Sequence, residues 1–127
     1  MVALAIAAIA FGLVGFAILK GLRWFAALSR RAQLRAYDGV AASDQPAPGL
    51  VRVVFHVYSG FLVFVNQHEH CFWAAPDDAR LILSRLHRFN LTWGFFAYGA
   101  LFIPLLSFGN YWTQRNRIAK QAAGLIA

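Results

Sequence analysis

The densest cluster of groups that could bind a metal is His68-Glu69-His70-Cys71, which contains the chain's single cysteine. On a β-strand, residues two apart share one face, so His68 and His70 could both reach one metal ion. Imidazole nitrogen suits zinc, copper, nickel or iron. More ligands are needed, but the strand pairing predicted below places His56 and Cys71 on the opposite face. The pairing therefore argues against a simple cluster of all four.

Haem is a second chemistry that the histidines could support. A b-type haem needs axial ligands from helices that face one another. His56 would lie inside a membrane only if residues 50–66 form a helix, and His87 or another subunit would then supply the second ligand. Cys71 lies beside His70 without a triad pattern, and the chain has no G-x-S-x-G motif and no Gly-rich phosphate loop. We therefore expect no enzyme activity and no cofactor, with haem b or a transition metal at the histidines as the alternative.

The composition indicates a membrane protein. The chain has 127 residues, of which 60% are hydrophobic and only 13% are charged, against about 25% charged residues in soluble domains. We expect an α-helical membrane protein with two transmembrane helices (alternatively three) and a small β-hairpin plus an amphipathic helix between them. The net charge is +7. Because the basic residues flank apolar stretches, they favour anionic lipid headgroups over nucleic acid.

Residues 1–20 form the first predicted transmembrane helix. A secretory signal would carry basic residues before its apolar run, whereas here they follow it, so we interpret the segment as an uncleaved anchor with the N-terminus outside. The small residues Ala8, Gly12 and Gly15 could let another helix pack closely. Residues 21–37 predict a basic amphipathic juxtamembrane helix. The residues expected to touch lipid headgroups here are Lys20, Arg23, Arg30, Arg31 and Arg35.

The middle of the chain allows two interpretations. Residues 38–49 are a linker, and residues 50–75 predict a β-hairpin with its turn at Ser59-Gly60. This turn pairs Tyr58 with Phe61 and His56 with Val63. The alternative is a third transmembrane helix over residues 50–66. Residues 76–89 then predict an amphipathic helix that lies on the membrane surface or packs on the hairpin, with one apolar face made of Ala79, Ile82, Leu83 and Leu86.

Residues 90–112 carry no charge and form the last predicted transmembrane helix. Trp93 near one end, with Tyr111 and Trp112 at the other, suit the two membrane interfaces. Gly94 and Gly99 offer flat surfaces for a partner helix. Residues 113–127 are a basic tail, whose headgroup-binding residues are Arg115, Arg117 and Lys120.

These features predict a small non-catalytic accessory or assembly subunit of a larger inner-membrane complex of respiratory, photosynthetic or secretion type. Two or three spans cannot enclose a solute pathway, so the expected partners are other membrane-protein subunits and anionic lipids. The expected location is the bacterial inner membrane. The alternatives are a haem- or metal-binding redox subunit that uses His56, His68, His70 or His87, and a self-associating membrane protein.

Overall fold

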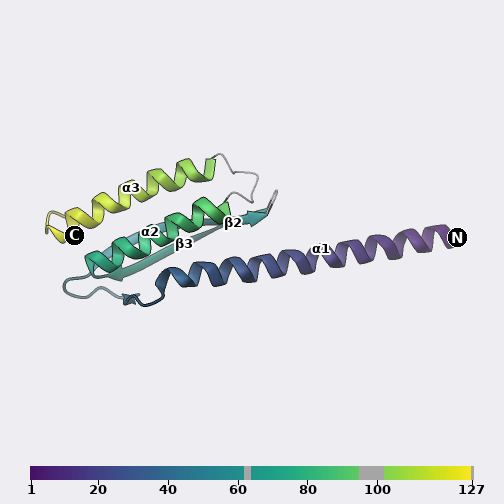
Figure 1. Ribbon diagram of the computed structural model, residues 1–127, viewed down its shortest axis with the longest axis horizontal. Helices are drawn as coiled ribbons and strands as arrows, with labels where there is room; N and C mark the ends of the chain where they lie inside the picture. Colours follow the sequence, from purple (N-terminus) through teal and green to yellow (C-terminus); the bar gives the residue numbers. More distant parts are fainter. Residues whose placement is uncertain (62–63, 95–101, 127) are drawn as a thin grey trace.

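A computed structural model describes residues 1–61, 64–94 and 102–126, and its longest element is the first helix, α1 (Val2–Leu34). A short 3-10 helix, η1 (Arg35–Tyr37), continues it. Figure 1 shows the first half of α1 projecting beyond the rest of the chain, while its second half lies alongside. In the described residues, the segment Val2–Tyr37 is the one helical stretch long and apolar enough to cross a membrane by length and composition.

A three-stranded antiparallel sheet follows, made of β1 (Ala42–Ser43), β2 (Val51–Phe61) and β3 (Phe64–Ala74) in the order β1-β3-β2. The predicted turn at Ser59-Gly60 is wrong, because pairing continues to Phe61 opposite Phe64. Tyr58 pairs with Gln67 and His56 with Glu69. The observed register is favoured because it pairs the whole of β3 with β2. A turn at Ser59-Gly60 would leave the second half of β3 without a partner in β2. A membrane helix over residues 50–66 is likewise excluded.

Helix α2 (Pro76–Trp93) covers one face of the sheet. Its acidic first turn, Asp77 and Asp78, suits the positive end of the helix dipole. Its predicted apolar face is confirmed as a core face, because all four side chains are fully buried. These four side chains pack against alternate residues of β2. The part of the core that α2 and β2 form between them includes Val51, Val53, Phe55, Val57, Ala79, Ile82, Leu83 and Leu86.

Helix α3 (Phe102–Ala122) lies beside α2 and β2. The predicted single helix over residues 90–112 is therefore not observed. Residues 90–93 end α2, and residues 102–112 begin α3. The end of α2 and the start of α3 lie in contact, since a Cβ added at Gly94 would meet Ile103 Cγ2 at 2.6 Å. Pro104 falls in the first turn of α3, where its missing N–H has no helical partner to lose. The predicted tail is helical as far as Ala122.

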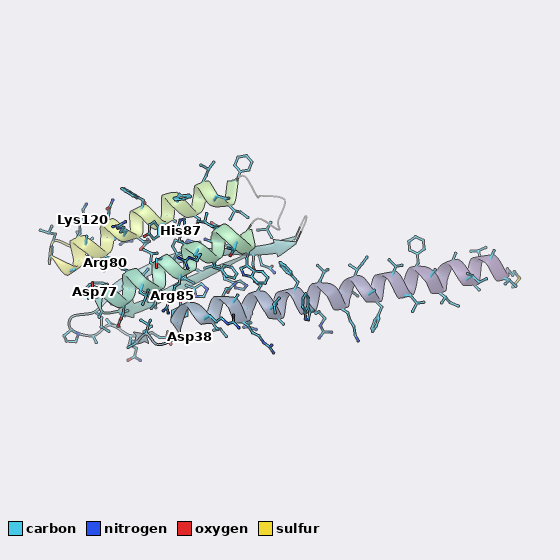
Figure 2. All side chains as sticks on the ribbon, viewed as in Figure 1. Asp38, Asp77, Arg80, Arg85, His87 and Lys120 are labelled. Atoms are coloured by element: carbon cyan, nitrogen blue, oxygen red, sulfur yellow. The ribbon has the colours of Figure 1, made fainter. Side chains whose placement is uncertain are left out.

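We call the sheet together with α2 and α3 the body. The second half of α1 and the residues that follow it are held against this body by contacts at two levels. The Phe25 and Trp93 rings pack with centroids 5.3 Å apart. Further along, the Arg85 guanidinium of α2 donates hydrogen bonds to the backbone carbonyls of Ala36 at 3.2 Å and Asp38 at 2.8 Å. Figure 2 shows Arg85 and Asp38 at the end of the body where α1 gives way to the sheet. The projecting half of α1 and the half that contacts the body therefore form one continuous helix.

Candidate functional site

The four histidines lie in three different places. His68 and His70 share one face of β3, and His56 lies on the other face, where its Nε2 is 3.2 Å from a Glu69 carboxylate oxygen. His87 lies in α2, between that helix and α3 (Figure 2). Over the described ranges, no group of three or more histidine, cysteine or acidic side chains is placed to hold a metal ion. The structure therefore does not bring the four histidines into one site.

His70 is half-buried against Tyr37 of η1. The Tyr37 hydroxyl and His70 Nδ1 form a hydrogen bond at 2.8 Å, and the two rings stack with centroids 5.8 Å apart. Burial, followed by the nearby charge of Asp44, raises the pKa of Tyr37 to about 12. Burial, followed by the charge of His68, lowers the pKa of His70, which favours its neutral ring. The pair joins η1 to the sheet.

His87 forms a buried pair with Ser107 that resembles a nucleophile and its base. The Ser107 hydroxyl lies 2.8 Å from His87 Nδ1 and accepts a hydrogen bond from Asn90 Nδ2 at 3.0 Å. Burial lowers the pKa of His87. The Tyr111 ring stacks on the imidazole with centroids 4.6 Å apart. Ser107 has no exposed surface, so the pair lies within the contact between α2 and α3.

Three carboxamide side chains close the free edge of β2. Gln121 Oε1 accepts the backbone N–H of Arg52 at 2.9 Å, and Gln114 Oε1 accepts that of Val54 at 3.4 Å. Asn90 continues this carboxamide ladder: its Oδ1 accepts the N–H of Tyr58 at 2.8 Å, and its Nδ2 donates to the carbonyl of His56 at 2.9 Å.

The ladder satisfies backbone groups that an edge strand would otherwise offer to another chain. Sequence reasoning missed it, although residues 107, 111, 114, 118 and 121 follow a three-four spacing that marks one helix face.

The outer face of α3 is apolar. This exposed α3 face consists of Phe102, Leu105, Leu106, Phe108 and Trp112, and Leu105 is 70% exposed. Trp112 thus lies on the surface, whereas Trp93 and Tyr111 are half-buried against other rings. Figure 1 shows α3 beginning on the side of the body from which α1 projects. An apolar surface of this kind indicates contact with protein or lipid.

The predicted packing residues lie in two settings. Ala8, Gly12 and Gly15 lie on the projecting half of α1, where a Cβ added at either glycine meets nothing within 4 Å. Gly94 packs inside the body against Ile103. Gly99 lies outside the described residues.

The predicted headgroup-binding residues are exposed and lie on two helices. The α1 group is Lys20, Arg23, Arg30, Arg31 and Arg35, and the α3 group is Arg115, Arg117 and Lys120.

A cavity of about 670 Å³ lies between α1 and the hairpin. We call it the α1–hairpin cavity. Its α1 wall runs from Leu19 to Gln33, and its sheet wall includes Ser59, Asn66 and His68. The buried Ser29 hydroxyl oxygen in the α1 wall has no hydrogen-bond partner in the part of the chain that the structure describes. Sequence reasoning missed this cavity, because it depends on how α1 crosses the sheet.

Comparison with known protein families, with functionally characterised proteins and with solved structures finds no match for this chain.

Proposed function

We propose that the chain is a membrane-anchored, non-catalytic subunit of a larger assembly in a bacterial inner membrane. In this role α1 inserts into the bilayer, and the sheet with α2 and α3 forms a small body at the membrane surface. The subunit stabilises its assembly through helix–helix and lipid contacts. Its partners are other membrane-protein subunits.

The projecting half of α1 carries this proposal. Residues 2–19 contain no charged or strongly polar side chain, and none of the most apolar 18-residue window is buried within the structure. At about 1.5 Å per residue this segment measures about 27 Å, close to the roughly 30 Å of a bilayer core. Exposing so many large apolar side chains to water is unfavourable by about 25 cal/mol per Å². A lipid surrounding removes that cost.

The continuity of α1 supports an anchor over a cleaved leader. The helix runs unbroken from its apolar half into the half that packs on the body, and Ser29 and Gln33 of that second half are buried. Lys20, Arg23 and the later arginines follow the apolar half, which favours a cytoplasmic body. The mature protein is therefore expected to keep its N-terminal residues.

The exposed α3 face supports contact with a partner. It is a second apolar surface, separate from the anchor, and it lies on a helix that begins at the end of the body from which α1 projects (Figure 1). The redox alternative draws less support, because the described histidines occupy three separate environments. A haem absorbance or a stoichiometric metal in the purified protein would favour that alternative.

Photo-crosslinking in intact membranes tests the proposal. A photoreactive phenylalanine analogue replaces Leu105 in the exposed α3 face, or Leu13 in the projecting half of α1. The control places the analogue at Arg88, an exposed position of α2. We expect adducts with a different membrane protein from the first two positions and none from the control. A stable monomer in mild detergent without adducts contradicts the proposal, and adducts of twice the chain mass replace it with self-association.

A further inference from the structure

The α1–hairpin cavity changes in character along its length. Leu19, Leu22 and Phe25 line the part nearest the projecting half of α1, and Ser29 with Gln33 line the part further into the body. Residues 19 and 29 are about 15 Å apart along a helix. The cavity volume of about 670 Å³ falls within the range of about 300–1,000 Å³ typical of ligand sites. The α1 wall of this elongated cavity is thus apolar at one end and polar at the other, which suits an amphiphile.

The charge of the cavity wall is positive. Arg23 and Arg30 lie two helical turns apart on α1, and no aspartate or glutamate is among the lining residues. Neither arginine forms an ion pair with any residue that the structure describes. A guanidinium group binds phosphate through paired N–H donors. The cavity is therefore suited to an anion.

Ser29 provides an independent indication of a ligand. Its side chain is 2% exposed and lines the cavity, and its Oγ has no hydrogen-bond partner among the described residues. A buried hydroxyl without a partner destabilises a protein. A ligand oxygen in the cavity would accept the missing hydrogen bond.

The geometry points to a binding site for one anionic phospholipid in the α1–hairpin cavity. The lipid phosphate binds Arg23 and Arg30 and accepts a hydrogen bond from Ser29. The acyl chains pass Leu19 and Leu22 towards the projecting half of α1, which lies in the bilayer. This inference rests on the membrane anchorage proposed above, because the lipid then enters sideways at headgroup level.

Native mass spectrometry of the full chain tests the site. The protein is incorporated into nanodiscs of phosphatidylcholine, alone or with phosphatidylglycerol, and the lipids retained after gentle release are counted. We expect one retained phosphatidylglycerol. The double variant R23Q/R30Q reduces this retention about tenfold or more, and Ser29→Ala reduces it about fivefold. The matched control, R31Q/R35Q, removes the same charge from two predicted headgroup-binding residues outside the cavity wall, so it weakens surface attraction to the bilayer and keeps the lipid bound in the cavity.

Three results overturn the site. Equal losses in R23Q/R30Q and R31Q/R35Q show general surface attraction, and equal retention of phosphatidylcholine shows that the lipid charge is irrelevant. Displacement of the lipid by millimolar inorganic phosphate assigns the cavity to a free anion. Failure of the anchorage itself is detected separately, as release of the wild-type chain from membranes by alkaline carbonate.

Discussion

Helices α2 and α3 lie side by side on the same sheet but distribute their side chains in opposite ways. α2 buries Ile82 and Leu83 and exposes Arg80. α3 turns the polar Ser107 and Gln114 inward and exposes its apolar face outward. Its inner polar groups are engaged with α2 and the edge of β2. The contrast teaches that α2 presents mainly polar side chains to its surroundings, whereas the first half of α3 presents apolar ones.

The largest expected difference between the two helices comes from truncating one leucine in each. Leu83→Ala in α2 should lower the free energy of unfolding by about 2–5 kcal/mol, because it leaves a cavity in the core. Leu105→Ala in α3 should change it by less than about 0.5 kcal/mol. Chemical unfolding of both variants in detergent measures the difference. Similar losses would show that the exposed α3 face packs within the chain.

Removal of Asn90 tests whether polar side chains stabilise the interior of this fold. Asn90→Ala leaves the Tyr58 N–H and the His56 carbonyl without their partner, at about 1–3 kcal/mol for each buried group. The control is Thr92→Ala, which removes an exposed hydroxyl bonded only to its own helix. Unfolding curves compare the two variants. Equal stabilities would mean that water replaces the carboxamide without loss.

The contact between Gly94 and Ile103 tests how closely the two helices approach. Gly94→Ala should destabilise the protein by about 1–3 kcal/mol, because its Cβ would overlap the Ile103 side chain. The Ile103→Ala background should relieve most of that loss. Gly109→Ala, which enters open space on α3, should be neutral or stabilising by up to about 1 kcal/mol. Thermal unfolding compares the wild type, the three single variants and the Gly94/Ile103 double variant, and additive effects in the double variant would contradict the contact.

The smallest expected effect is a dependence of stability on pH. Burial lowers the pKa of His70 and of His87 in the folded state, whereas an unfolded histidine titrates near about 6.5. As pH falls below that value, the unfolded chain binds protons first, so stability is full above it and declines towards the folded pKa. The melting temperature should therefore fall between pH 7.5 and pH 5.5. The double variant H70Q/H87Q should flatten this slope, and an unchanged slope would assign it to other groups.

Local patterns predicted part of this architecture. The apolar face of α2 followed from its helical spacing, and the first helix from an uninterrupted apolar run. The last helix was predicted wrongly because an uncharged stretch of 23 residues satisfies the length of a membrane span even when its two ends belong to different helices. The turn at Ser59-Gly60 was wrong because a weak turn signal competes with the ladder that the whole of β3 can form.

The candidate site depended more strongly on tertiary structure. The opposite placement of His56 relative to His68 and His70 was predictable, because it needs only the two-residue alternation of a strand. The α1–hairpin cavity and the carboxamide ladder were not, because both join segments more than twenty-five residues apart in the chain. The spacing of residue types along α1 does not indicate which side of this helix contacts the sheet.

The unbroken course of α1 has a mechanical consequence. The apolar half of α1 and the half held against the body by Phe25 and Arg85 form one stiff helix with no flexible joint between them. Tilting or rotating α1 therefore turns the sheet by the same angle. A partner bound to the apolar half of α1 would therefore determine the orientation of the body.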